Sequence, residues 1–143
     1  MSIDCRVDVT VPASSADTWD RLAGVATWPG WNPSCEAADL EGDHFAPGTR
    51  MRLTLRHPAG RTFFTRPWVV AAERARHMAW EARALGVRAR TDVELQDEQE
   101  GTRVLLSTQT RGVLAFSYRW AMRPTTQAQI YAVMLGGLAE SFR

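Results

Sequence analysis

Lysine is absent from this sequence of 143 residues, and all 17 basic side chains are arginines. Schiff-base enzymes, pyridoxal enzymes and P-loop nucleotidases all depend on a lysine amine that forms a covalent bond or binds phosphate. The sequence also lacks the G-x-S-x-G motif of serine hydrolases and the G-x-G-x-x-G motif of dinucleotide-binding domains. These absences exclude lysine-dependent chemistry and leave no residue that we assign as catalytic.

Cysteine and histidine are also scarce. Cys5 and Cys35 form no C-x-x-C pair and have no histidine nearby in the sequence, so neither a disulfide framework nor a zinc site is indicated. His44, His57 and His77 show none of the spacings that bring two imidazoles to one metal ion. We therefore expect two reduced, buried thiols, surface histidines, and no metal or cofactor.

Long apolar runs and clusters of one charge are missing too. No stretch approaches the roughly 20 apolar residues that span a bilayer, and segment 1–11 alternates polar with apolar residues, unlike a signal peptide. The net charge is +1, and neither sign is concentrated in an arm or tail. We expect a cytoplasmic protein with no membrane span and no nucleic-acid partner.

The apolar content is sufficient for a core. Hydrophobic residues make up 45% of the sequence and charged residues 23%, which is typical of a packed globule. A chain of this length buries roughly 70% of its unfolded surface. Because no linker, repeat or low-complexity tract interrupts it, we expect a single domain over 1–143.

The first 33 residues predict a strand followed by two short helices. Apolar residues at the odd positions of 3–11 alternate with polar ones, which indicates a half-buried strand. Ser14 or Ser15 then provides a helix N-cap, and Gly24 ends that helix. Segment 25–33, VATWPGWNP, has room for one helical turn before a loop.

The rest of the sequence predicts about six strands and one long helix. From Thr125 to Phe142 apolar residues recur at helical spacing without an internal proline. We therefore predict an α+β fold, in which a curved antiparallel sheet of six to seven strands surrounds a long C-terminal helix. A bent sheet with a helix across its concave side leaves a space that side chains or a ligand must fill. The predicted strand segments are 35–40, 49–56, 61–72, 77–83, 87–95 and 102–111.

Short sequence signatures recur along the chain: VPASSADTWDRLAGVATWPGWNP at 11–33, PGTR at 47–50, FTRPWVV at 64–70, HMAW at 77–80, GTR at 101–103 and LAESF at 138–142. In this order they resemble the START-like (SRPBCC) superfamily and, more narrowly, its bacterial polyketide cyclase/dehydrase group. The resemblance implies a helix-grip fold with a hydrophobic cavity between the sheet and the C-terminal helix. Some similar proteins bind lipids, hormones or other apolar metabolites, and a few cyclise or aromatise polyketides.

Two positions depart from what the resemblance implies. Many members of the group have a histidine where this sequence has Thr91 and a glutamate near Thr108, both expected to point inward on adjacent strands. Threonine hydroxyls cannot replace those groups as general acids or bases near neutral pH. The departures favour binding of a hydrophobic or aromatic small molecule, lipid-like or polyketide-like, over catalysis.

The predicted ligand would be held mainly by burial of its apolar surface, at about 25 cal/mol per Å². Hydrogen bonds from Thr91, Thr108 and Asn32 would orient it. Trp31 and Asn32 lie in the loop at the expected cavity mouth, where a plain turn-and-cap role is an equal alternative. The predicted ligand-binding residues are Trp31, Asn32, Met51, Leu53, Phe63, Met78, Trp80, Thr91, Val93, Leu106, Thr108, Ile130, Tyr131 and Met134.

Two rival functions stay open. In the first, the same pocket belongs to a polyketide cyclase or aromatase, in which it folds a polyketone chain and a tyrosine or arginine polarises a carbonyl. Tyr118 and Tyr131 can each donate a hydroxyl into the cavity or simply belong to the core. In the second, the protein is a stress-related or toxin-like partner protein with a filled core and no ligand.

Phe64, Arg66 and Trp68 share one face of a predicted strand. If Phe63 and Val69 point inward, this face is exposed and is a candidate homodimer contact. In the opposite register Arg66 lies inside, where it needs a ligand carboxylate or an internal acid. An Arg66 that is paired with a protein carboxylate, or that lies in water, removes the ligand-anchor alternative.

Overall fold

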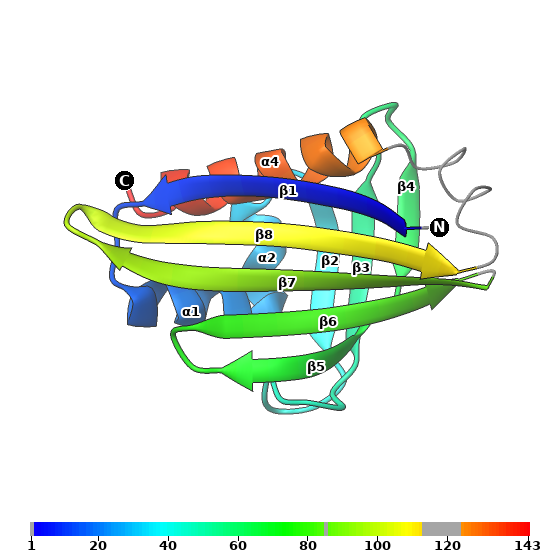
Figure 1. Ribbon diagram of the computed structural model, residues 1–143, viewed down its shortest axis with the longest axis horizontal. Coiled ribbons are helices and arrows are strands. Elements are labelled where there is room, and N and C mark those ends of the chain that lie inside the picture. Colours follow the sequence, from blue (N-terminus) through cyan, green and yellow to red (C-terminus); the bar gives the residue numbers. More distant parts are fainter. Residues whose placement is uncertain (1, 85, 113–123) are drawn as a thin grey trace.

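The computed structural model describes residues 2–84, 86–112 and 124–143. Figure 1 shows helices and a smaller sheet lying on one side of a larger sheet of long strands. Tyr118 lies outside the described residues. The elements are β1 (Ser2–Val11), α1 (Ser15–Ala23), the 3-10 helix η1 (Val25–Thr27), α2 (Trp28–Trp31), β2 (Cys35–Leu40), β3 (Met51–Arg56), β4 (Thr62–Thr65), β5 (Trp68–Glu73), β6 (His77–Ala84), β7 (Val87–Glu98), β8 (Gly101–Gly112) and α4 (Pro124–Glu140).

The larger sheet has the strand order β1-β8-β7-β6-β5, and all its neighbours are antiparallel. Strands β7 and β8 are 12 residues long and pair along their whole length, from Val87 with Gly112 to Glu98 with Gly101. The smaller sheet has the order β2-β3-β4. Its strands cross behind the larger sheet in Figure 1, so that the two sheets enclose one interior.

The two sheets join at Pro67. The Met51 amide donates to the Pro67 carbonyl and the Val69 amide donates to the Thr49 carbonyl, each at 2.8 Å. Proline has no amide hydrogen and cannot continue a strand ladder. The segment 61–72, expected as one strand, therefore divides into β4 and β5, and the described residues form eight strands instead of six or seven.

The short helices follow the local sequence signals. The Ser14 hydroxyl accepts from the Asp17 amide at 3.1 Å, and the Gly24 amide donates to the Asp20 carbonyl at 3.0 Å, so that both ends of α1 are capped as predicted. The segment VATWPGWNP forms η1 and the single turn α2. Among the described helices, none combines the length and the hydropathy needed to cross a membrane.

The long helix α4 runs beside β1 and packs against it. One core fills the space between the helices and the sheets, and it includes Trp19 and Leu22 of α1 as well as strand residues of both sheets. The α+β helix-grip fold expected from the sequence is the observed fold. The buried apolar residues of α4 recur at helical spacing: Ile130, Met134, Leu135, Leu138 and Ala139.

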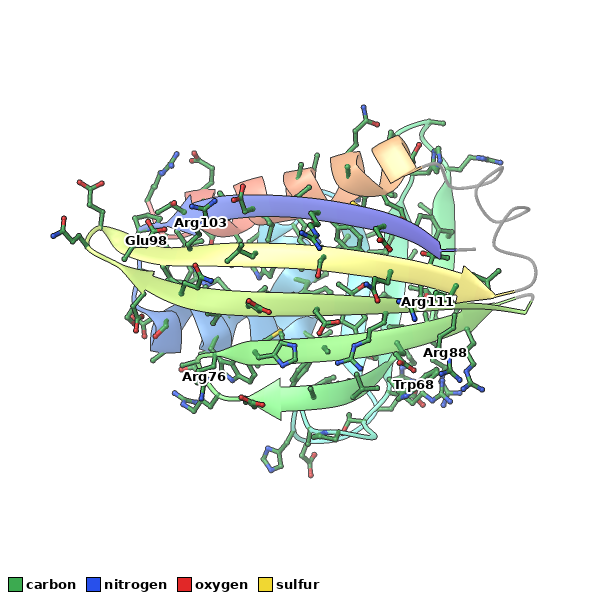
Figure 2. All side chains as sticks on the ribbon, in the orientation of Figure 1. Trp68, Arg76, Arg88, Glu98, Arg103 and Arg111 are labelled. Atoms are coloured by element: carbon green, nitrogen blue, oxygen red, sulfur yellow. The ribbon has the colours of Figure 1, made fainter. Side chains whose placement is uncertain are left out.

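The other face of the larger sheet is polar. Figure 2 shows charged side chains standing on this outer face, among them Arg88 of β7 and Arg103 of β8. Arg103 forms an ion pair with Asp8 of β1. Because polar and apolar residues alternate along these strands, the apolar residues lie on the opposite face, which lines the interior.

Candidate ligand-binding cavity

A cavity of about 100 Å³ lies inside the fold. Residues of both sheets, of α4 and of the segment around α2 form its wall, so it exists only when all of these parts are assembled. Its described lining residues are Trp28, Asn32, Leu53, Leu55, Phe63, Thr65, Pro67, Trp80, Ala82, Ala89, Thr91, Thr108, Gln127, Ile130, Tyr131 and Met134.

The register of the larger sheet builds one wall of this cavity. Trp80 of β6 lies opposite Thr91 of β7, and Thr91 lies opposite Thr108 of β8. Ala82 and Ala89 form the next inward pair of β6 and β7. Directly opposed residues share one face of a sheet. Two alanines side by side leave a hollow that larger side chains would fill.

Three hydroxyl groups meet at this wall. Thr91 Oγ1 lies 3.2 Å from Thr108 Oγ1 and 3.3 Å from Tyr131 Oη. Burial raises the pKa of Tyr131 above its ordinary value, and hydrogen bonds with Thr91 and Thr108 offset only part of that rise. The Tyr131 hydroxyl is therefore protonated at neutral pH and is able to donate a hydrogen bond.

The described wall contains no arginine, histidine, aspartate or glutamate side chain. Its polar groups besides the hydroxyl cluster are the Thr65 hydroxyl and the amides of Asn32 and Gln127. All other described lining residues are hydrocarbon, aromatic or thioether groups. A wall of this composition suits an apolar guest that has few polar atoms.

Asn32 makes the turn contact considered for it and also lies at the cavity wall. Its Oδ1 accepts a hydrogen bond from the Ser34 amide at 2.9 Å, which closes the turn before β2. Its side chain is also part of the cavity wall. The Ser34 hydroxyl in turn donates to the Ile130 carbonyl at 3.3 Å and so connects this turn to α4.

Trp31 does not line the cavity. Its ring is half-buried, and its indole N–H donates to Thr27 Oγ1 at 3.3 Å. Trp28, one helical turn earlier, occupies the wall instead, with its indole N–H donating to the Leu22 carbonyl at 2.9 Å. The two indole rings contact each other edge to face at 6.1 Å between centroids.

The structure brings most of the other predicted ligand-binding residues together. Met51, Met78, Val93 and Leu106 are the exceptions, because they lie in the packed core and not at the cavity. The predicted residues at the cavity wall are Asn32, Leu53, Phe63, Trp80, Thr91, Thr108, Ile130, Tyr131 and Met134.

The exceptions face the same interior as the cavity but at other points along their strands. Val93 and Leu106 lie on β7 and β8, where α1 packs on the concave side, and both belong to one hydrophobic cluster with Trp19 and Leu22. A two-residue period shows which face of a strand points inward. It does not show which part of that face a helix covers, so the period alone cannot separate core positions from cavity positions.

Several lining residues were not predicted. Leu55 and Thr65 continue the inward alternation of Leu53 and Phe63 by two residues, so the period alone could have identified them. The pair Ala82 and Ala89 follows the same rule beyond Trp80 and Thr91. The remaining unpredicted residues, Trp28, Pro67 and Gln127, are brought to the wall by the packing of α2, the sheet junction and α4.

The alternative in which Arg66 anchors a ligand is wrong. Arg66 makes two hydrogen bonds to the Glu41 carboxylate, at 2.5 and 2.7 Å, on the exposed side of the small sheet. The hydrogen bonds from Arg66 lower the pKa of Glu41 below its ordinary value. The Arg66 guanidinium is thus paired with a protein carboxylate through two hydrogen bonds, so it does not require a ligand carboxylate.

The strand face that carries Phe64, Arg66 and Trp68 is the exposed one, which is the first of the two predicted registers. Phe64 is 64% exposed, whereas Val69 is fully buried. Trp68 is half-buried, and its ring centroid lies 5.0 Å from the Arg50 guanidinium and 5.5 Å from that of Arg83. Figure 2 labels Trp68 of β5 and Arg88 of β7 toward the same end of the larger sheet. The homodimer contact at Phe64 and Trp68 stays a prediction.

The histidines and cysteines do not converge. His44 is exposed, His57 is half-buried, and the half-buried His77 places its Nε2 2.9 Å from Asp92 Oδ2. Cys5 and Cys35 are buried free thiols, and burial raises the pKa of both. Within the described residues, no group of three or more side chains is arranged to hold a metal ion.

Solved structures of low sequence identity share this fold. The di-domain ARO/CYC BexL from the BE-7585A biosynthetic pathway superposes with a TM-score of 0.78 at 16% identity, covering 99% of this chain and 50% of that one. This chain thus spans about half the length of that protein. Major latex-like protein 151 from Panax ginseng superposes with a TM-score of 0.80 at 12% identity, covering 99% and 97%. Protein NE0264 from Nitrosomonas europaea superposes with a TM-score of 0.69 at 14% identity, covering 97% of this chain and 96% of that one.

The sequence comparison places the chain in a family. No curated protein sequence matches it. A family model described as polyketide cyclase / dehydrase and lipid transport matches residues 2–142. Since that match covers nearly the whole chain, the protein belongs to the polyketide cyclase/dehydrase and lipid transport family.

Proposed function

We propose that this protein binds a small apolar molecule in the cavity formed by the two sheets and α4. The observation that carries the proposal is the hollow itself. It is lined mainly by hydrocarbon, aromatic and hydroxyl groups, with the two amides of Asn32 and Gln127, and the hydrophobic core surrounds it. Membership of a family described by cyclisation and lipid transport supports the same role.

The size of the cavity bears on what can bind. Pockets that enclose drug-sized ligands measure about 300 to 1,000 Å³, and an engineered cavity of about 150 Å³ holds benzene. At about 100 Å³ this cavity is smaller than both. A folded polyketone chain of several rings therefore needs a large rearrangement, whereas a single-ring guest needs only a small one. The volume supports binding of a small molecule more than multi-ring cyclisation.

Cyclase or aromatase chemistry is the second candidate, and one observation favours it. The protonated Tyr131 hydroxyl in the cavity wall is suited to stabilise a carbonyl oxygen on which negative charge develops. Against it, the described wall offers no second ionisable group to exchange protons with a substrate. A tyrosine with a raised pKa is also a poor general base near neutral pH.

Binding is tested by titrating the protein with toluene and following methyl NMR signals of the lining residues. Saturable shifts centred on Leu53, Leu55, Ile130 and Met134 are expected. The substitution Ala82→Leu fills the hollow and is expected to abolish them, whereas Ala37→Leu, at an exposed position of β2, leaves them unchanged. Wild-type protein that takes up no toluene, or equal uptake by the Ala82→Leu variant, contradicts the proposal.

A further inference from the structure

The hydroxyl cluster in the cavity has hydrogen-bonding capacity to spare. Thr91 stands in the middle, with one contact to Thr108 and one to Tyr131. Each hydroxyl carries one proton and two lone pairs. Because Tyr131 also hydrogen-bonds with Thr108, the contacts within the cluster use at most three protons and three of six lone pairs. The cluster therefore keeps lone pairs that can accept a hydrogen bond from a guest hydroxyl, and the Tyr131 hydroxyl can donate to a guest oxygen in place of one of its threonine contacts.

Away from this cluster the same cavity is mainly apolar. Rings of Trp28, Phe63 and Trp80 line it together with Ile130 and Met134. Trp28 and Trp80 also contact each other, with 5.8 Å between ring centroids. A guest thus meets a cluster of three hydroxyl groups on a wall that is otherwise mainly hydrophobic and aromatic, with the Thr65 hydroxyl and the Asn32 and Gln127 amides as its other polar groups.

A charged guest is disfavoured by the same wall. A carboxylate guest would lose its hydration without meeting an arginine or histidine, and an ammonium guest would meet no carboxylate among the described lining residues. Burying an unpaired charge is far more costly than burying a hydrogen-bonded hydroxyl or carbonyl. A hydrogen bond from the neutral Tyr131 hydroxyl compensates the lost hydration of a neutral oxygen well and that of a full charge poorly.

From these observations, and resting on the proposed function, we infer that the ligand is a neutral molecule of no more than one ring that carries a carbonyl or hydroxyl oxygen. That oxygen hydrogen-bonds to the cluster of Thr91, Thr108 and Tyr131, and the ring lies among the aromatic side chains. The cluster is therefore the specificity-determining element of the cavity.

The experiment compares four probes: toluene, phenol, benzamide and benzoate. Phenol replaces the methyl group of toluene by a hydroxyl, and benzamide is the neutral isostere of benzoate. Dissociation constants are measured at pH 7 by calorimetry or NMR titration for wild-type protein. We expect wild-type protein to bind benzamide at least tenfold more tightly than benzoate.

Substitutions in the cavity wall test which protein groups hydrogen-bond to the guest oxygen. Tyr131→Phe is expected to weaken phenol binding about five- to tenfold, the range of one lost hydrogen bond, and to leave toluene binding within about twofold. Thr91→Val is expected to act in the same direction, and Thr91→Ser to restore the wild-type preference. Thr54→Val removes a hydroxyl from the other face of β3, opposite the exposed Phe64 and away from the cavity, and it is the matched control that leaves phenol binding unchanged.

The outcomes separate this inference from the proposed function. If wild-type protein binds toluene but Tyr131→Phe weakens phenol and toluene binding equally, the role of the cluster is overturned. The proposed binding of an apolar guest then still stands. Benzoate binding as tight as that of benzamide overturns the preference for a neutral guest. Failure of all four probes to bind wild-type protein overturns the proposed function itself.

Discussion

Gly137 of α4 lies directly against the backbone carbonyl of Trp31. A Cβ atom at Gly137 would overlap the Trp31 carbonyl oxygen and would lie 2.9 Å from Cδ of Pro33. The preceding Gly136 has no atom within 4 Å of its Cβ position. This close approach holds α4 against the segment after α2, next to the turn in which Asn32 joins the cavity wall.

Substitution of these two glycines is expected to have opposite effects. Gly137→Ala forces α4 away from the backbone of Trp31 and lowers the free energy of unfolding by about 1–3 kcal/mol. Gly136→Ala meets open space and gains helix propensity, so it raises the free energy of unfolding by up to about 1 kcal/mol. Urea unfolding followed by tryptophan fluorescence measures both. Equal stability of the two variants would contradict the close contact.

Alkaline pH is expected to destabilise the fold. Burial raises the pKa of Cys5, Cys35 and Tyr131 in the folded protein. A group whose folded pKa is raised contributes stability that is present below its unfolded pKa and is lost as pH rises through the folded value. The free energy of unfolding is therefore expected to fall above about pH 8.5 for the thiols and above about pH 10 for the tyrosine.

Substitutions separate the contributions of the thiols and of the tyrosine to this loss of stability at alkaline pH. The double substitution Cys5→Ala and Cys35→Ala is expected to flatten the part of the slope that begins above about pH 8.5, and Tyr131→Phe the part that begins above about pH 10. Urea unfolding curves between pH 7 and 11 supply the measurement. A Tyr131→Phe protein that keeps the wild-type slope above pH 10 would show that the phenol is not desolvated.

Acid pH is expected to weaken a different part of the molecule. Burial acts to raise the pKa of Asp92, but hydrogen bonds from Arg90 and His77 together outweigh it and hold that pKa below its ordinary value. Stability from Asp92 is therefore present above its unfolded pKa of about 3.9 and is lost as pH falls through the lower, folded pKa. In Asp92→Asn the free energy of unfolding should fall less steeply below about pH 4. An unchanged acid limb in urea titrations would rule out this contribution.

Self-association is expected to depend on Phe64. Phe64 and Val133 are the exposed large hydrophobic residues among those that the structure describes. If the predicted homodimer forms through the face of Phe64 and Trp68, Phe64→Ser weakens it and Val133→Ser, on the surface of α4, does not. Sedimentation velocity over a range of protein concentrations measures the dimer. A wild-type protein that is monomeric throughout, or equal dimerisation of both variants, contradicts the prediction.

Local sequence signals were sufficient to predict the order of the elements and the inward faces of the strands. The alternation along β7 and β8 placed Thr91 and Thr108 inside, because successive strand residues point to opposite faces. The caps at Ser14 and Gly24 bounded α1, because these residues satisfy free backbone groups of their own helix ends. Such signals are local, so a single sequence carries them.

The position of the hollow in the interior depends on how distant parts of the chain pack together. Val93 and Leu106 satisfy the same alternation as Thr91 and Thr108, yet they lie in packed core. The split of 61–72 at Pro67, and the contact of Tyr131 with a threonine 40 residues earlier, likewise depend on how both sheets and α4 come together. Packing of parts that are distant in sequence sets these features, and no local periodicity encodes the distance between a helix and the sheet beneath it.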